Sequence, residues 1–377
     1  MIDVSQVPRP PQRQHESVAI GGLRLEDCPR PVSHGGDAAP TPRRQVDAGW
    51  LQWIAENKLR RCSPESMTDT MVGAGLDPVQ ARAAIQAMES DPGYQAALKM
   101  RQLRDKLASV MGNLQKLWES DPLYGHVEKR SRLSHDEFVT RYVRGCRPVV
   151  LTDIAHDWPA RERWSPAYLK ERFGHLTVEI QAERGQDQLY EVNKLKHKRE
   201  VKLGDFVDRV LAMGVSNDEY LTANNELLRR PEFAPLLADI GTLPPYCDRS
   251  KLAERSSFWF GPAGTVTPLH HDTLMLFHTQ IVGRKRWRFV SPLETPRLYN
   301  HYLVYSAVNL DNVDLQRHPD FAQVKVLDVV VEPGETMFLP LAWWHQVSSL
   351  DVSLSFSFSN LNVPNQFEYV HAEITNW

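Results

Sequence analysis

The sequence predicts an α+β protein whose C-terminal two-thirds is built around an antiparallel β core. From Tyr220 onward, short runs of β-branched and aromatic residues alternate with Gly, Pro and Asn turns, which is typical of a barrel or sandwich. The segments before that region have the apolar spacing of amphipathic helices. The expected strands cover 258–260, 275–282, 287–290, 324–331, 336–339 and 352–358.

Composition and charge narrow the class of protein. The chain has 377 residues, with 44 Lys and Arg against 47 Asp and Glu, and a formal net charge of −3. This balance supplies no broad basic surface, so binding of duplex nucleic acid is not expected. No apolar run is long enough for a bilayer, and the N-terminus lacks an apolar signal core, which predicts a cytoplasmic protein without membrane contact. The four cysteines contain no CxxC pair and fit free thiols in a reducing compartment.

Residues 1–45 form the first predicted region. They are rich in proline and glycine, which disfavours both helices and central strands. We expect a mostly disordered arm, and two alternatives stay open: a tail without function or a docking segment.

Residues 46–119 are predicted to form a small helical module. Ser63 before Pro64, and Asp77 before Pro78, are N-cap residues followed by proline at the first helical position. Further along, apolar residues recur at alternating steps of three and four, as in a coiled-coil seam. These residues are Met100, Leu103, Leu107, Val110, Leu114 and Leu117. The seam either packs within the chain on the preceding helices or forms a homodimer through the helical module.

Residues 120–377 are expected to form the third region, which carries every candidate for chemistry. A buried strand is predicted at 148–151, a helix after the N-cap Ser165, and an amphipathic helix at 203–213. Because all candidate site residues fall between Tyr220 and His345, the helical module is not expected to be needed for the site.

A candidate metal site begins with His270 and Asp272. Side chains alternate along a strand, so these two share one face while His271 points away. A later strand-like stretch at 333–340 leads to His345, which joins them only when the barrel folds. Two imidazoles and one carboxylate on one side of a cation form the facial triad of non-heme Fe(II) oxygenases. The alternative is that His270 is a packed barrel histidine and Asp272 a turn carboxylate.

Cationic and hydroxyl side chains are predicted beside this triad. Lys285 follows the tight turn at Gly283, which places its ammonium on the neighbouring strand. Tyr220 and Thr267 supply hydroxyls on strands that flank the same pocket. An ammonium and hydroxyls grouped inside a barrel favour an anionic ligand.

The ordered series of motifs resembles that of the JmjC-type, cupin-like Fe(II)- and 2-oxoglutarate-dependent oxygenases. The resemblance runs from about Leu133 to Ser359 and is strongest to the protein-hydroxylase branch, which includes the asparaginyl hydroxylase inhibiting hypoxia-inducible factor. The motifs are Arg147-Pro148-Val149-Val150-Leu151, Asp157-Trp158-Pro159-Ala160, Trp164, Tyr220-Leu221, Trp259-Phe260-Gly261-Pro262, Thr267 to Asp272, Gly283-Arg284-Lys285, Pro333-Gly334-Glu335 and Trp344-His345. The resemblance implies a double-stranded β-helix, or jelly roll, with supporting helices.

The resemblance also implies Fe(II) as the metal and 2-oxoglutarate as the cosubstrate. The residues that match the catalytic metal ligands are His270, Asp272 and His345. Lys285 matches the lysine that pairs with the distal carboxylate of the cosubstrate, and Thr267 and Tyr220 match its hydroxyl contacts.

One position departs from the family pattern. These hydroxylases commonly place an asparagine four residues after the aspartate, and this chain has Leu276 there. His278 lies on the same strand face as Leu276. It either supplies a replacement hydrogen bond to the cosubstrate or is a packed interior histidine.

The implied activity is hydroxylation of a side chain in a protein or peptide, coupled to decarboxylation of 2-oxoglutarate to succinate. The alternatives are an oxygenase acting on a small metabolite or a tRNA base, and a non-catalytic cupin-like binding protein. The intact triad and Lys285 argue against the non-catalytic alternative. Demethylation of methyl-lysine is disfavoured because the sequence shows no reader module or histone-directed segment.

Overall fold

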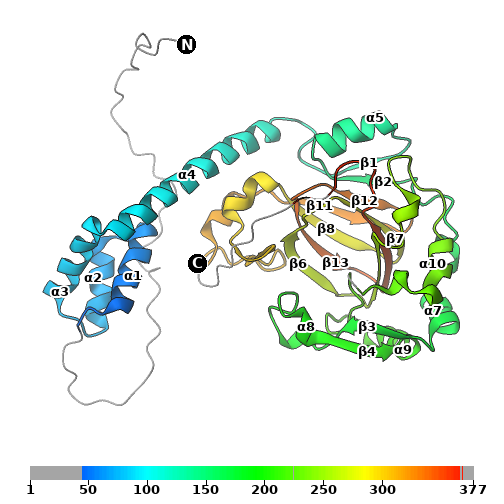
Figure 1. Ribbon diagram of the computed structural model, residues 1–377, viewed down its shortest axis with the longest axis horizontal. Coiled ribbons are helices and arrows are strands. Elements are labelled where there is room, and N and C mark those ends of the chain that lie inside the picture. The colour runs from blue at the N-terminus through cyan, green and yellow to red at the C-terminus, as the bar shows by residue number, and fades with distance from the viewer. Residues whose placement is uncertain (1–44, 224, 366, 368–377) are drawn as a thin grey trace, which may run out of the picture. The chain divides into compact units, whose positions relative to one another are not determined.

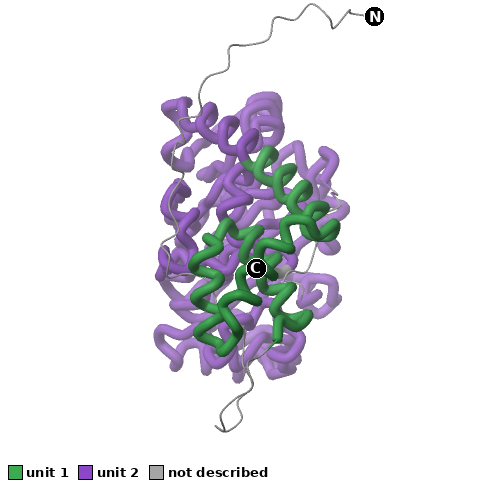
Figure 2. Tube along the Cα trace, turned by 90° about the vertical axis from the view of Figure 1, so that its left-hand side faces the viewer, with its two compact units in different colours: residues 1–108 green, residues 109–377 purple. Residues whose placement is uncertain are grey.

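The computed structural model describes residues 45–223, 225–365 and 367, so the predicted arm lies outside the described residues except for its last position. The chain divides into two compact units, residues 1–108 and 109–377 (Figure 2). This division falls inside the long helix α4 (Pro92–Glu119), whereas the sequence predicted a boundary after residue 119. The three-part organisation into arm, helical module and oxygenase domain stays a prediction.

The first unit contains a small helical core. Its helices are α1 (Ala48–Leu59), α2 (Pro64–Gly73), α3 (Pro78–Ala87) and the first part of α4. The predicted caps are confirmed: the Ser63 side chain accepts a hydrogen bond from the backbone N–H of Ser66, and Asp77 accepts from two backbone N–H groups. The buried apolar residues are Trp50, Trp53, Ile54, Met67, Met71, Leu76, Ala81, Ile85 and Met88.

The second unit is built on two six-stranded sheets with strand orders β1-β2-β12-β7-β14-β5 and β11-β8-β13-β6-β10-β9. The first sheet contains β1 (Glu128–Arg130), β2 (Val149–Leu151), β5 (Ser256–Gly261), β7 (Leu276–Val282), β12 (Thr336–Leu339) and β14 (Ser353–Phe358). The second contains β6 (Val266–His271), β8 (Lys285–Val290), β9 (Asn300–Tyr302), β10 (Tyr305–Ser306), β11 (Leu327–Val331) and β13 (Trp344–Ser349). A separate two-stranded sheet pairs β3 (Thr177–Gln181) with β4 (Lys198–Lys202).

The two large sheets enclose a common interior, and their pairings are antiparallel except for the parallel pair β1 and β2 (Figure 1). One apolar cluster draws Val150 and Met337 from the first sheet and Trp287, Phe289 and Val347 from the second. The predicted α+β class with a jelly-roll, double-stranded β-helix core is therefore confirmed. Most of the predicted strands are also present, with 336–339 coinciding with β12.

Helices cover the outer face of the first sheet and complete the main hydrophobic core. They are α5 (His135–Phe138), α6 (Ala160–Arg163), α7 (Pro166–Phe173), α9 (Leu203–Met213) and α10 (Ala234–Ala238). Helix α8 (Lys194–His197) lies instead beside β3 of the two-stranded sheet. The predicted helix at 203–213 is confirmed as α9, and Ser165 caps α7 by accepting from the backbone N–H of Tyr168. In the described part of the chain, no helix combines the length and the apolarity that a membrane span requires.

Strand β14 shows how the sequence opens space inside the barrel. Its residues alternate between large apolar side chains and serines. Leu354, Phe356 and Phe358 pack in the core shared with the helices. The serines, including Ser357, point the other way because successive side chains alternate across a strand. Small polar side chains on the inner face leave room there for a cavity.

Candidate metal centre and cosubstrate pocket

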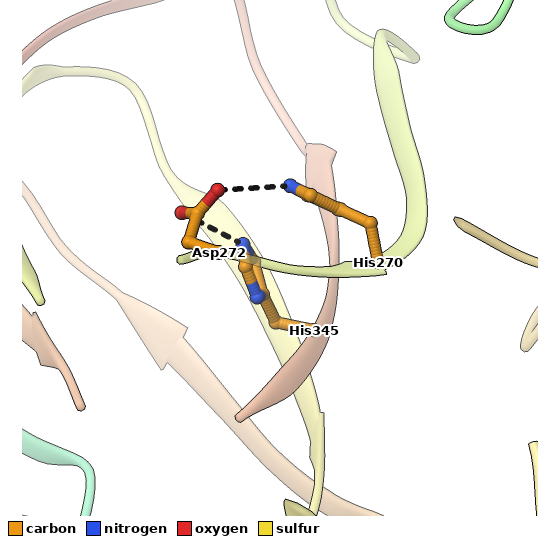
Figure 3. Close-up of side chains that lie close together, drawn as sticks. All are labelled: His270, Asp272 and His345. Atoms are coloured by element: carbon orange, nitrogen blue, oxygen red, sulfur yellow. Dashed lines mark ion pairs between the residues drawn. The ribbon is translucent and has the colours of Figure 1, made fainter. Parts of the chain in front are cut away.

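His270 and His345 face each other from neighbouring strands. They are register partners on the antiparallel strands β6 and β13, and Asp272 directly follows β6. The Asp272 carboxylate oxygens lie 4.0 Å from Nε2 of His270 and 3.9 Å from Nε2 of His345 (Figure 3). The three ligand atoms all lie within 4.8 Å of one another. The structure thus brings the predicted triad together, while the ring of His271 packs on Trp344, with centroids 4.7 Å apart.

Backbone carbonyls orient both imidazoles. Nδ1 of His270 lies 2.7 Å from the carbonyl oxygen of Pro268, and Nδ1 of His345 lies 3.0 Å from that of Trp343. A carbonyl only accepts hydrogen bonds, so the proton of each neutral ring is on Nδ1. The lone pair on each Nε2 is then directed at the Asp272 carboxylate, where a metal ion can bind both rings.

Burial tunes the protonation of the triad. Burial lowers the pKa of His345 well below its ordinary value, and the neighbouring His270 lowers it further. His345 is therefore a neutral imidazole, which is the form that binds metals. Enclosure raises the pKa of Asp272, an effect that His270 partly opposes. A partly buried carboxylate of this kind is stabilised as an anion by a bound cation.

Lys285 lies in the same interior with its ammonium group desolvated. The residue is 1% exposed, and its Nζ donates a hydrogen bond of 2.9 Å to the hydroxyl of Tyr220. The Nζ atom also lies 5.4 Å from the ring centroid of Trp259. Among the described residues, no carboxylate is within ion-pair distance of this ammonium. Burial lowers the pKa of Lys285 to about 7, so an anionic ligand would stabilise its charged form.

A β-bulge brings Thr267 to the side of His270. Thr267 pairs with Val347, and His270 pairs with His345. The two partners are three residues apart on β6 but only two apart on β13, so β6 contains one extra residue at this point. Without the bulge, residues three apart on a strand would point to opposite faces. With it, both Thr267 and His270 line the same cavity.

His278 and Leu276 also line this cavity, as the alternation along β7 predicted. The His278 ring lies between two indoles, with centroids 5.7 Å from Trp259 and 5.1 Å from Trp287. Burial, followed by the charge of Lys285, lowers the pKa of His278 well below its ordinary value. Its buried Nε2 has no hydrogen-bond partner among the described residues.

The cavity that these side chains line has a volume of about 630 Å³. That size is within the usual range for small-molecule sites and can hold a small dicarboxylate together with one substrate side chain. The donors inside it fit both groups. The triad presents two nitrogens and a carboxylate to a metal ion, and Lys285 and the unpaired Nε2 of His278 can bind an anion.

The sequence did not indicate Arg184, whose side chain contacts Val266 and Tyr220 beside the pocket. This side chain is fully buried, and its Nη2 donates to the carboxylate of Glu191 at 3.0 Å and to the carbonyl of Val266 at 2.8 Å. Its guanidinium lies over the ring of Tyr190, 4.3 Å from the centroid, and 5.3 Å from that of Tyr220. Arg184 thus connects the start of β6 to Tyr220. No local motif marks it, because Val266 and Tyr220 are distant from it in the sequence.

Tyr305 is a second residue that the sequence did not single out. It lies on β10 in register with His270, and the two rings stack with centroids 5.7 Å apart. Burial raises the pKa of its phenol above the ordinary value, so the hydroxyl is neutral and available as a hydrogen-bond donor at the metal side of the cavity.

Comparison with known proteins places this site in a family. Residues 135–363 match the family described as the cupin-like domain. The chain is 32% identical over 233 residues to lysine-specific demethylase 8 of Xenopus tropicalis, an alignment covering 60% of this chain and 50% of that protein. It is 32% identical over 238 residues to Jumonji C domain-containing protein 5 of Drosophila melanogaster, covering 60% and 57%. It is 26% identical over 277 residues to arginine-specific demethylase JMJ20 of Arabidopsis thaliana, covering 64% and 59%.

The chain spans between half and three-fifths of the length of these curated relatives. The family match covers more than half of the chain and includes both strands that supply the metal ligands. These findings agree with the resemblance seen in the sequence motifs. The chain therefore belongs to the cupin-like domain family.

Proposed function

We propose that the chain is a dioxygenase that hydroxylates a side chain in a protein or peptide and converts 2-oxoglutarate to succinate. The observation that carries this proposal is the convergence of His270, Asp272 and His345 at one end of a cavity that also encloses the desolvated ammonium of Lys285. A metal-ligand set and an anion-binding group in one enclosed space suit a metal and a dicarboxylate that act together.

The triad residues hold Fe(II) in this proposal. The two Nε2 atoms and the Asp272 carboxylate occupy one side of the metal and leave the other side open to the cavity. A metal held by these residues would supply the oxidative chemistry: decarboxylation of 2-oxoglutarate would provide two electrons for the reduction of dioxygen, one oxygen atom would enter succinate, and the other would enter a C–H bond of the substrate. The carbonyls of Pro268 and Trp343 keep the two rings in their metal-binding orientation.

Lys285, Tyr220 and Thr267 bind the distal carboxylate of 2-oxoglutarate. The lysine supplies the charge, and the two hydroxyls supply further hydrogen bonds, Thr267 from β6 and Tyr220 from an isolated bridge to Gln181. His278 supplies a hydrogen bond from the position next to Leu276, where the family commonly has an amide. Two observations support this role: His278 lines the cavity, and its buried Nε2 has no hydrogen-bond partner among the described residues. Trp259 and Trp287 line the pocket, and their apolar rings limit the access of water to it.

A polypeptide substrate is supported by the names of the relatives, which include a lysine-specific and an arginine-specific demethylase. The mouth of the cavity carries charges of both signs that are paired with each other: Lys198 lies 2.8 Å from Glu179, and Arg229 lies 3.1 Å from Glu226. A mouth without excess charge does not select a small anionic metabolite. A cytoplasmic location and the lack of duplex nucleic-acid binding stay predictions.

Demethylation is the second candidate, and the same relatives favour it. The sequence disfavoured demethylation because the chain shows no histone-directed segment. Demethylation and side-chain hydroxylation nevertheless begin with the same insertion of oxygen into a C–H bond. Oxygen inserted into an N-methyl group gives a carbinolamine that loses formaldehyde. Hydroxylation of a carbon in the side chain leaves the oxygen atom in the product.

The test is to incubate the full chain with Fe(II), 2-oxoglutarate and peptides captured from a cell extract. Succinate release is measured together with the masses of the peptides. A gain of one oxygen atom supports hydroxylation, whereas loss of a methyl group with formaldehyde release supports demethylation. The His270→Ala variant is the control and should give neither product. Succinate release that only small metabolites or tRNA stimulate would overturn the proposal of a protein substrate.

A further inference from the structure

Helix α4 has two faces that behave differently. One face makes contacts inside each unit: in the first, Asp105 accepts a 3.1 Å hydrogen bond from Arg61, and in the second, Gln115 donates to the Tyr124 hydroxyl at 2.7 Å. Gly112, on the same face as Gln115, is also buried. The helix therefore already has its intrachain contacts, and they lie away from the predicted seam.

The opposite face is the α4 seam, which consists of six exposed apolar residues. Their exposed fractions are Met100 67%, Leu103 50%, Leu107 56%, Val110 51%, Leu114 45% and Leu117 66%. Within the first unit, Met100, Leu103 and Leu107 are exposed and not packed on the preceding helices, so the intrachain alternative raised by the sequence is not realised for this part of the seam. Six apolar side chains in one row on an exposed helix indicate an interaction surface.

We propose that the α4 seam is the interface between two copies of this chain, with the two α4 helices antiparallel. The seam residues alternate by three and four along the helix, which is the a/d spacing of a coiled coil. This spacing keeps a narrow apolar row facing a partner helix of the same kind. With Met100, Leu107 and Leu114 at a positions, Leu103, Val110 and Leu117 are at d positions.

The residues beside the seam argue for a helix as the occupant. The flanking g positions are Lys99, Lys106 and Asn113, and the flanking e positions are Arg104, Met111 and Trp118. The three g residues and Arg104 are exposed, whereas Met111 and Trp118 are partly buried. A helix that lies on a membrane presents a wide apolar face. Here polar and charged side chains border the apolar row along its whole g side and at Arg104 on its e side, as in the seam of a two-helix contact.

Charge decides the orientation of the two helices. In a parallel pair, each g residue meets the e residue five positions later on the partner, so Lys99 would face Arg104 of the partner copy. In an antiparallel pair centred between Ala108 and Ser109, g faces g and e faces e. Lys106 then faces Asn113 of the partner copy, and Arg104 faces Met111. The basic half of each helix thus meets the neutral half of the other, and no like charges are opposed.

The same antiparallel register fills the seam with apolar layers. Met100 pairs with Leu117 of the partner copy, Leu103 with Leu114, and Leu107 with Val110. Each pairing occurs twice by two-fold symmetry, so all twelve seam side chains of the two copies are covered. An isologous interface of this type closes on itself and gives a dimer rather than an open chain of subunits.

The first test measures the mass of the full chain by sedimentation equilibrium at about 1–50 μM. The wild-type chain is expected to be a dimer, and Leu107→Asp with Leu114→Asp is expected to be a monomer. The matched control is Gln102→Asp with Ser109→Asp, which adds the same charges to exposed positions of α4 outside the seam and should stay a dimer. Circular dichroism shows whether the seam variant is folded. A monomeric wild-type chain, or a folded seam variant that stays a dimer, overturns the proposal.

The second test uses cysteine cross-linking and needs no destabilising charge. Leu107→Cys and Val110→Cys chains are oxidised separately and as a mixture, beside the wild-type chain as a background for its own thiols. The antiparallel register predicts a cross-link between the two variants in the mixture and little within either one alone. Efficient cross-linking of Leu107→Cys with itself would indicate a parallel pair and would overturn the orientation. Binding of a monomer to vesicles of anionic phospholipid would assign the seam to a membrane surface instead.

Discussion

His270 and His345 occupy opposite positions on adjacent antiparallel strands, and their ring centroids lie 4.1 Å apart. This pairing joins two strands that are far apart in the sequence, β6 and β13. It also carries both imidazoles to the Asp272 carboxylate. The metal site therefore exists only when β6 and β13 pair in this register, because a shift of one residue would turn one of the rings to the other face.

Loss of one ligand is expected to weaken iron binding while the fold remains. His270→Ala or Asp272→Ala leaves two donors, and we expect the affinity for Fe(II) to fall by more than about tenfold, since even residues that only orient ligands cost that much. His175→Ala removes an exposed imidazole and serves as the control. Metal content and succinate release are measured for all three variants. Unchanged values for the His270 and Asp272 variants would show that the metal site lies elsewhere.

Lys285→Ala is expected to affect the cosubstrate rather than the metal. Removal of one partner of a buried ion pair costs about 3–5 kcal/mol, because the other charge stays desolvated. The dissociation constant of 2-oxoglutarate should therefore rise by about two to four orders of magnitude, while Fe(II) still binds. Calorimetry with Mn(II) in place of iron measures both. The neighbouring Arg284→Ala, which breaks an exposed ion pair with Asp351, should change neither value. Equal loss of metal and cosubstrate would make Lys285 a structural residue.

Binding of 2-oxoglutarate is expected to weaken as the pH rises. Burial lowers the pKa of Lys285 to about 7 in the free protein, and a bound carboxylate raises it because it stabilises the ammonium. Below pH of about 7 the ammonium is already present. Above that pH, binding must take up a proton, so the affinity falls by up to about tenfold per pH unit. Calorimetry in two buffers of different ionisation enthalpy at about pH 8 measures the uptake. Lys285→Arg should abolish the slope, and a slope that persists in it belongs to another group.

His278 is expected to contribute a hydrogen bond to the cosubstrate. His278→Leu should raise the dissociation constant of 2-oxoglutarate by about tenfold, the usual cost of one lost hydrogen bond to a charged group. Adding Leu276→Asn to this variant should restore part of the affinity, because it supplies the amide that the family commonly has. Thr279→Val removes a buried hydroxyl that bonds Thr336 instead, and should leave binding unchanged. A His278→Leu variant that loses stability but keeps its affinity would make His278 a packing residue.

The helices of the first unit are expected to be dispensable for the metal site. A truncated chain that begins at Ser109 should bind Fe(II) and 2-oxoglutarate with unchanged affinity. A chain that begins at Asp121 should also bind both, but its free energy of unfolding should fall by about 1–3 kcal/mol, because Tyr124 loses the hydrogen bond from Gln115. Thermal unfolding and metal binding are measured on both. Loss of both ligands in a folded, soluble preparation would show that the helices belong to the catalytic domain.

Local patterns in the sequence determined the parts of the structure that depend on near neighbours. The caps at Ser63, Asp77 and Ser165 lie three residues or fewer from the backbone groups that they bind. The shared face of His270 and Asp272 follows from the two-residue period of a strand. The alternating serines of β14 likewise indicate one face in the core and one face towards a cavity. Each of these features depends on backbone periodicity or on hydrogen bonds within one turn.

Tertiary structure alone decided the features that depend on the pairing of distant segments. The bulge that turns Thr267 towards His270 is a property of the β6–β13 register, and strand periodicity would have separated the two. Arg184 reaches Val266 and lies over Tyr220 only in the folded barrel. The spacing of the α4 seam was visible in the sequence, but its exposure was not, because exposure depends on which face of α4 the other residues of the chain cover. Register and burial are set by the packing of the whole chain, and no local pattern contains them.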